Sequence, residues 1–409
     1  MTAPSFKVIV VGAGPAGLLL ALLLSQHGMS VTVLEAAAEL DSRPRATHYG
    51  SPAVYELQRA GVMDDVMAEG LTTRKICWRK LDGTYLAGID NDVLGDDPDR
   101  VVCLPLNRLG QILARHLQRQ PTAELKWNHR VTSLAQDSTK AWVSVSTAEG
   151  DITMEADYIV GCDGANSQIR RSLHGDMTFP GKTWDEQIVA TNVYYDFDHY
   201  GYEDANFIID PEHWHMASRI TRDGMWRVSY GEKAGATHEE LAARQPMKFA
   251  KMLPGNPSPH QYKLTNFSPY RVHQRLAVSM REGRFLLAAD AAHLCNPFGG
   301  LGLTGGIVDV GGLSDCLYGV WTGQANQEIL DIYDVIRRQK YRDIVDPISS
   351  ENLRRMYDSN LETVLEPGKD KFLEMCVNAE KDVELAREMA LGINVLKYDF
   401  RQHYTNTKL

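Results

Sequence analysis

A glycine-rich turn between strongly apolar segments constrains this chain more than any other feature. Residues 7–11 (KVIVV) have the composition of a buried strand, and the turn GAGPAG leads from them into LLLALLLSQHG and then SVTVLEA. The order strand, turn, helix, strand is a βαβ unit, which requires a parallel sheet with crossover helices. Because glycines and Pro15 interrupt the uncharged run at residues 8–24, we interpret it as a buried strand and helix rather than a membrane span.

The glycines of this turn have the spacing of a dinucleotide-binding loop. Gly12 permits the tight turn, Gly14 lets the backbone approach a pyrophosphate, and Gly17 allows the helix to pack on the strand. Ala16 lies at the start of the helix, whose free N–H groups face the anion. Glu35 ends the next strand, where its carboxylate can accept hydrogen bonds from ribose hydroxyls. The alternative, a glycine turn without a nucleotide, is disfavoured because strand, helix and acid are all in register.

Composition excludes several classes of function. The chain has 409 residues, 44% of them hydrophobic and 23% charged, which predicts a large core and two interlocked domains and excludes wholesale disorder. A formal net charge of −10 disfavours nucleic acid and anionic membranes as partners. The six cysteines lack CxxC or CxxH spacing, which predicts reduced thiols, no zinc or other metal site, and a cytoplasmic location.

The pattern along the chain predicts an α/β fold with an insertion. A Rossmann-like nucleotide-binding domain begins with residues 1–180. Alternating aromatic and polar runs in residues 181–281 predict an inserted antiparallel sheet that binds the substrate. The segment RFLLAADAAH then returns the chain to the first domain, over residues 282–325. Residues 326–409 are predicted to be mostly helical, and their helices could cover the sheet or form a contact in a homodimer.

Two further motifs follow buried strands. The stretch DYIVGCDGANSQIR places Asp163 in a loop, although an Asp-Gly pair taken alone is more often only turn chemistry. In the stretch ADAAHLCNPFGGLGLTGG, Asp290 lies at the carboxyl end of a strand, and Pro297 and a glycine-rich loop then lead into a helix. Such a loop exposes consecutive N–H groups and permits close approach of a flat ligand.

Together the three motifs resemble those of the group A flavoprotein monooxygenases, the family of para-hydroxybenzoate hydroxylase and related aromatic hydroxylases. The resemblance covers essentially the whole chain and implies that FAD is the cofactor. It implies that the first motif and Glu35 bind the ADP half of FAD, that Asp163 lies near FAD and NAD(P)H, and that Asp290 faces the ribitol and pyrophosphate. The sequence departs from the family pattern at Ala289, where a glycine is expected, and at Thr304, where an asparagine is expected.

The resemblance also implies other cofactor contacts. Arg45 would reach FAD, and Arg108, in a predicted helix over residues 106–117, would contact its phosphate region. Gly302 and Leu303 would offer N–H groups to the flavin ring, and Pro297 would lie close to where oxygen reacts. For both arginines the alternative is an ordinary solvated charge.

The activity implied by the resemblance is hydroxylation of a phenolic small molecule, with or without loss of a ring carboxylate. NAD(P)H would reduce FAD, and the reduced flavin would bind O2 as a C4a-hydroperoxide that the aromatic ring attacks. Two alternatives stay open. One is epoxidation of an alkene or polyene, and the other is a regulatory protein that binds FAD without turnover.

The predicted substrate contacts lie on the inserted sheet and beside the first motif. Arg219 could stabilise a phenolate, and Tyr230 could relay a proton. His48 lies three residues beyond Arg45 and could act as a base, because its charge can change near neutral pH. The alternative for each of these residues is an ordinary structural role, and strand alternation leaves open which residues of the sheet face the substrate.

Overall fold

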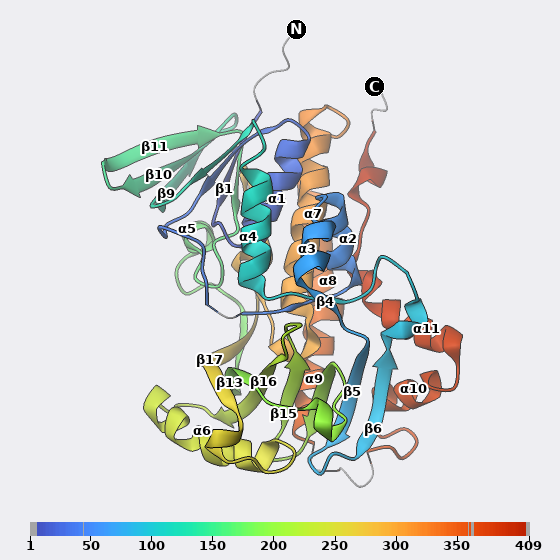
Figure 1. Cartoon of the computed structure of the whole chain (residues 1–409). Helices are drawn as coiled ribbons and strands as arrows, with labels where there is room; N and C mark the ends of the chain where they lie inside the picture. The colour runs from blue at the N-terminus through green and yellow to red at the C-terminus, as the bar shows by residue number, and fades with distance from the viewer. Residues whose placement is uncertain (1–5, 44, 359, 361–363, 406–409) are drawn as a thin grey trace.

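The protein is described by a computed structural model that covers residues 6–43, 45–358, 360 and 364–405. Strand β1 and its neighbours form one end of the molecule, at the top of Figure 1, and β13, β15 and β16 lie at the other end. The long helix α7 (Leu301–Trp321) runs from the first end toward the second. The predicted α/β class with a helical C-terminus is confirmed.

A mostly parallel sheet carries the first motif, as the βαβ pattern predicts. Within the described residues its six strands are, in spatial order, β18 (Arg281–Glu282), β19 (Phe285–Leu287), β12 (Tyr158–Gly161), β1 (Lys7–Val11), β2 (Ser30–Leu34) and β8 (Ala123–Lys126). Strand β1 pairs in parallel with both β2 and β12. Strand β19 pairs in parallel with β12, so the chain returns to this sheet after the insertion.

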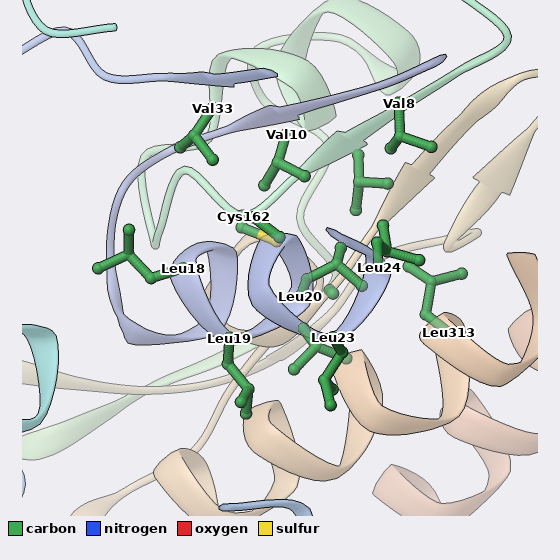
Figure 2. Close-up of a cluster of buried hydrophobic side chains, with 14 of the residues drawn as sticks. Val8, Val10, Leu18, Leu19, Leu20, Leu23, Leu24, Val33, Cys162 and Leu313 are labelled. Carbon is green, nitrogen blue, oxygen red and sulfur yellow. The ribbon is translucent and has the colours of Figure 1, made fainter. Parts of the chain in front are cut away.

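Helix α1 (Pro15–Gln26) is apolar on all sides because it is covered on all sides. Figure 2 shows Leu18, Leu20 and Leu24 in a cluster with Val10 of β1 and Leu313 of α7. Helix α4 (Leu106–Leu117) contacts α1 as well and matches the helix predicted at these residues. The buried helix thereby fixes the glycine turn at its N-terminus.

The predicted inserted sheet is present and is larger than its segment. Among the described residues it holds eight strands in the order β20 (His293–Leu294), β17 (Lys263–Leu276), β13 (Gly181–Tyr194), β16 (Met225–Lys233), β15 (His215–Arg219), β14 (Ala205–Ile209), β5 (Lys75–Lys80) and β6 (Tyr85–Asp90). Strands β5, β6 and β20 come from outside residues 181–281, and β5 pairs in parallel with β14. Segments before and after the insertion therefore complete this sheet.

The two faces of the eight-stranded sheet have different partners. Helix α6 (His238–Met252) covers one face, where Phe249 packs in a cluster with Val228 and Tyr230 of β16. We call this the outer face. On the opposite face, Ile188 packs in a cluster with Phe298, which lies beside the predicted cofactor loop. We call this the inner face.

Smaller sheets and helices complete the fold. A short sheet joins β3 (His48–Tyr49), β7 (Val102–Cys103) and β4 (Leu71–Thr72), and another joins β9 (Arg130–Gln136), β10 (Ala141–Thr147) and β11 (Gly150–Ala156). The remaining helices are α2 (Ser51–Arg59), α3 (Met63–Glu69), α5 (Gln168–His174), α8 (Ile329–Lys340), α9 (Asp346–Met356), α10 (Lys371–Ala379) and α11 (Val383–Leu391). Helix α10 packs on β6, so part of the C-terminal region covers the eight-stranded sheet. In the part of the chain described here, no helix combines the length and hydropathy needed to cross a bilayer.

Candidate active site

The glycine turn after β1 has the local geometry of a nucleotide cradle. Gly12 adopts a φ of +104°, which favours glycine, and a Cβ at Gly17 would lie 2.0 Å from the Gly12 carbonyl oxygen. A Cβ at Gly14, by contrast, would meet no atom within 4 Å. Gly12 and Gly17 are therefore required by the protein's own packing, whereas Gly14 keeps open a space beside the N-terminus of α1, where Ala16 is partly buried.

Glu35 lies directly beside this turn. It follows β2, and its Oε2 accepts a hydrogen bond of 2.8 Å from the backbone N–H of Ala13. Its Oε1 accepts one of 2.8 Å from the N–H of Ala37. These bonds fix the carboxylate while each oxygen keeps a lone pair for another donor, such as a ribose hydroxyl.

The second motif holds a buried carboxylate, one oxygen of which has no hydrogen-bond partner among the described residues. Asp163 Oδ2 accepts from the N–H groups of Gln168 (2.7 Å) and Ile169 (3.2 Å). Asp163 Oδ1 is buried and has no hydrogen-bond partner among the described residues, and burial raises the pKa of this carboxyl. Arg170 donates to Ala291 O at 3.0 Å and to Ala165 O at 2.8 Å, and so joins the second and third motifs. This role of Arg170 needed the tertiary structure.

The third motif begins with an unusual backbone conformation. Ala289 has a φ of +57°, in the left-handed region that favours glycine, so alanine at the position of the family glycine adopts a strained backbone conformation. Asp309 of α7 accepts from Ala289 N (3.0 Å), His293 Nε2 (2.7 Å) and Arg337 Nε (2.6 Å). Burial opposes ionisation of Asp309, but His293 and Arg337 outweigh it and hold its pKa at about 2. This buried cluster, which the sequence did not reveal, fixes the turn in front of Asp290.

The glycine-rich loop then leads into α7. Gly302 and Leu303 belong to the first turn of this helix, whose N–H groups lack intrahelical acceptors. Thr304, the other departure from the family pattern, is buried, and its Oγ1 accepts from Gly50 N at 3.1 Å. The Thr304 hydroxyl thus ties the loop to the chain just after His48. Pro297 opens the turn η5 (Pro297–Gly299) that precedes the loop.

The two predicted arginine contacts lie at the surface. Arg45 is exposed and pairs with Asp41 at 2.9 Å, and its charge acts on Asp290, so it lies near the third motif. Arg108 is half exposed on α4 and pairs with Glu69 at 2.7 Å. Its FAD contact remains a prediction, and in the structure its side chain holds α4 to the end of α3.

Arg219 and Tyr230, in contrast, are not brought to His48. Tyr230 points to the outer face with Val228 and packs on Phe249 of α6. Arg219 pairs with Asp198, and its guanidinium lies 5.0 Å from the centre of the Trp226 ring, on the same outer face. The sequence-based choice therefore fell on residues of the outer face, because alternation along a strand does not say which face will be covered by a helix.

Arg227 of β16 lies on the inner face of the sheet, on the same side as His48. Arg227 is only 8% exposed, and it donates to Asn192 Oδ1 from Nε (3.1 Å) and Nη2 (3.0 Å) and to Arg45 O. No carboxylate of the described residues pairs with it. Burial lowers the pKa of this guanidinium, and Tyr270 opposes the shift, so that residue also lies near it. An arginine buried without a carboxylate can bind an anion.

His48 lies beside Arg227. Its Nδ1 is 2.9 Å from Thr47 Oγ1, and its buried Nε2 has no partner in the described part of the chain. Burial, reinforced by the charge of Arg227 and opposed by Asp204, lowers the pKa of His48 to about 4. The imidazole is therefore neutral at pH 7, and one ring nitrogen is free to exchange a hydrogen bond with a ligand.

Apolar side chains form the remaining wall on the inner face. Phe298 meets the Trp214 ring edge-on, with ring centroids 5.4 Å apart, in the cluster that contains Ile188. A Cβ at Gly231 would lie 2.0 Å from the Trp214 ring, so only glycine fits beneath it. The inner face thus combines aromatic side chains with the buried cation Arg227, beside which the neutral His48 lies, and this combination suits a flat phenolic ligand.

Comparison with known proteins decides the family. Residues 5–347 match the family model described as "FAD binding domain". The chain belongs to this FAD-binding family. It is 39% identical to a para-nitrophenol 4-monooxygenase of Pseudomonas sp. strain WBC-3 over 86% of this chain and 88% of that protein. It is 35% identical to a 6-hydroxy-3-succinoylpyridine 3-monooxygenase of Pseudomonas putida strain S16, over 93% of this chain and 96% of that protein.

The fold of this chain agrees closely with that of a solved structure. The crystal structure of p-nitrophenol 4-monooxygenase from Pseudomonas putida DLL-E4 superimposes with a TM-score of 0.89 at 36% identity, covering 96% of this chain and 98% of that one. The chain is an FAD-dependent aromatic hydroxylase, whose reaction consumes a nicotinamide reductant and O2 and acts on an aromatic substrate. The sequence-based assignment of family, cofactor and reaction class is confirmed.

The residues present fit FAD. The open space at Gly14 leaves room for a ligand, and the unpartnered Oδ1 of Asp163 offers it a buried polar atom. Glu35, Asp163 and Asp290 would hold the hydroxyl and phosphate portions together with the N–H groups of α1 and α7. FAD supplies the redox chemistry, since it takes two electrons from the reductant and delivers them to O2.

Proposed function

We propose that this enzyme oxygenates a phenol or hydroxypyridine and binds the ring hydroxyl as the anion between Arg227 and His48. The observation that carries the proposal is, within the described part of the chain, a buried cation without a carboxylate partner beside an unpartnered ring nitrogen, on the inner face. Arg227 is a buried cation without a carboxylate partner among the described residues, and His48 offers a buried, unpartnered Nε2. The cation favours the charged form of a bound phenol, and the neutral imidazole can accept its proton.

The role of this pair follows from the chemistry of the ring. A phenolate donates electrons into its ortho and para carbons much more strongly than a phenol does, so removal of the hydroxyl proton prepares the ring to accept oxygen. One oxygen atom of O2 is then added to the ring and the other leaves as water, with two electrons from NAD(P)H. Aromatic walls such as Phe298 hold the ring and exclude water.

We further propose that the oxygen is added to the ring carbon para to the hydroxyl. Position 4 of para-nitrophenol lies para to its hydroxyl, and position 3 of 6-hydroxy-3-succinoylpyridine lies para to the hydroxyl at position 6. In both named compounds that carbon carries a substituent. The proposal is therefore a para-substituted phenol, from which the para substituent leaves as the oxygen is added, a nitro group as nitrite and a carboxylate as CO2.

Alkene epoxidation and FAD binding without turnover are the alternatives from the sequence. No feature of the inner face, as far as the chain is described, favours either of them. A buried cation beside a neutral histidine has no role toward an apolar alkene. We also keep a cytoplasmic location and a homodimer as proposals. The cytoplasmic location is supported by free cysteines at residues 77, 103, 162, 295, 316 and 376, and light scattering would test the dimer.

The experiment is a substrate panel with product analysis. Purified enzyme with FAD is given NADH or NADPH, 18O2 and matched phenols that carry nitro, carboxyl, acyl or methyl groups para or meta to the hydroxyl. We expect faster reductant oxidation and one 18O atom in the product for the para-substituted series. Incorporation only at positions ortho to the hydroxyl would contradict the para proposal, and no incorporation into any phenol would contradict the substrate class.

A further inference from the structure

The turn between the cofactor loop and the inner face of the eight-stranded sheet is held by a buried polar network. This turn, η5, directly precedes Gly300 and the first residues of α7, and its Phe298 ring packs on Trp214 of the inner face. It therefore connects the wall of the substrate site to the loop that faces the cofactor. The side chains that hold it are at most 3% exposed: Asn296, Gln274 and Ser349.

The hydrogen bonds of this network have one consistent direction. Gln274 Oε1 accepts from Asn296 N at 3.1 Å, and Gln274 Nε2 donates to Ser349 Oγ at 2.7 Å. Ser349 Oγ donates to Val345 O at 2.5 Å. Because a carbonyl can only accept, the Ser349 hydroxyl must receive its other bond from the amide of Gln274. One orientation of this amide satisfies every partner.

Asn296 connects the network to the turn itself. Its Nδ2 donates to Ser349 O at 2.8 Å, and its Oδ1 accepts from Phe298 N at 3.0 Å. A Cβ added at Gly299 would lie 3.0 Å from the Ser349 Cβ, so the turn and helix α9 approach each other as closely as glycine allows. The position of Phe298 is thus set by α9 through Ser349.

The helix that carries Ser349 is itself interrupted by a wide turn. Residues Tyr341–Val345 form a π-helical turn between α8 and α9, a feature that occurs frequently at functional sites. Tyr341 Oη donates to Leu294 O at 2.7 Å. The same helical segment therefore holds the chain on both sides of Asn296. Tyr341 holds residue 294, Ser349 holds Asn296 itself, and Asn352 Nδ2 donates to Phe298 O at 3.3 Å.

We propose that Gln274 and Ser349 are positioning residues for the oxygen transfer. They hold the substrate wall and the cofactor loop at one separation, so that the substrate ring stays within reach of the oxygen. This inference rests on the proposed function. When the ring is out of reach, the electrons of NAD(P)H go to O2 alone, and NAD(P)H, H+ and O2 give NAD(P)+ and H2O2 without product. Loss of the network is therefore expected to lower the yield of product per reductant.

The test measures this yield together with cofactor binding. Ser349→Ala and Gln274→Met each remove the bond between the two side chains. Ser350→Ala is the matched control, because Ser350 is the next buried serine of α9 and its Oγ donates to Asp346 instead, at 3.1 Å. For each FAD-loaded protein we measure product and H2O2 per NAD(P)H, and for each apoprotein the melting temperature and the Kd for FAD.

Both network variants should raise the ratio of H2O2 to product about two- to tenfold, the range for one hydrogen bond removed, with wild-type Kd for FAD and wild-type coupling in Ser350→Ala. The double variant should be no more uncoupled than Gln274→Met, since Gln274→Met already breaks the bond between the two side chains that Ser349→Ala removes. Ser349→Cys, which keeps the shape with weak hydrogen bonding, serves if the alanine variant does not fold. Folded variants with unchanged coupling would overturn the inference. A wild-type enzyme that oxygenates no phenol would instead overturn the proposed function.

Discussion

Replacing Arg227 with methionine tests which face of the eight-stranded sheet binds the substrate. Methionine keeps much of the length and apolar bulk of the side chain but removes the guanidinium, and with it both bonds to Asn192 Oδ1. If Arg227 stabilises a phenolate, the substitution affects the bound substrate anion directly. The corresponding change at Arg219, Arg219→Met, removes a cation from the outer face of the same sheet.

The magnitude follows from the hydrogen bonds that each substitution removes. A hydrogen bond to a charged group contributes about 1.5–3 kcal/mol net, which corresponds to about a 10- to 150-fold lower kcat/KM for Arg227→Met. Asn192 Oδ1 is also left without its partners, and an unsatisfied buried acceptor costs about 1–3 kcal/mol of stability. Arg219 pairs with Asp198, whose side chain is 59% exposed. Such pairs contribute about 0–1 kcal/mol to stability, and this one lies on the outer face, so Arg219→Met should leave kcat/KM close to the wild-type value.

The assay is steady-state oxidation of NAD(P)H with the best phenol of the panel, with product formation measured in parallel and folding checked by melting temperature. Arg227→Lys keeps the positive charge and should recover part of the activity that Arg227→Met lacks. The assignment is refuted if Arg219→Met loses activity while folded Arg227→Met keeps it. That result would restore the outer-face contacts expected from the sequence.

The remaining predictions concern cofactor binding and pH. Gly14→Ala should fold normally yet bind FAD at least about tenfold more weakly, because its Cβ meets no protein atom but enters the ligand's space; fluorescence titration with FAD measures this. Gly17→Ala should instead lower the melting temperature of the apoprotein, because its Cβ would lie 2.0 Å from Gly12 O, and equal behaviour of the two variants would contradict this division. Burial lowers the pKa of both His48 and His215 from 6.5 to about 4. Between these values the unfolded chain binds protons that the folded protein excludes, so stability should fall as the pH falls from 6.5 toward 4, by up to about 3 kcal/mol per histidine. Urea unfolding at several pH values should show a shallower dependence in His215→Phe, and an unchanged dependence would contradict the assignment.

Much of the fold was predictable because its signals are local. The turn from Gly12 to Gly17 and the acid at Glu35 are set by spacing within one βαβ unit, and the chain cannot form this unit in another way. The return of the chain at 282–325 was also visible, because a buried strand precedes Asp290. The contribution of β5 and β6 to the second sheet was not visible, since nothing in residues 75–90 indicates which strand they will pair with.

The sequence by itself determined the nucleotide cradle and, through the family that its motifs resemble, the cofactor and the class of reaction, because each motif consists of residues that are neighbours along the chain. Tertiary structure decided which side chains lie on the same side as His48. Along β16, Arg227 and Tyr230 lie on opposite faces, and only the packing of α6 shows which of these faces a helix covers. The supports of the site, Asp309 beneath Ala289 and Ser349 behind Asn296, join residues far apart in sequence, and only the packing of α7 and α9 brings them into contact.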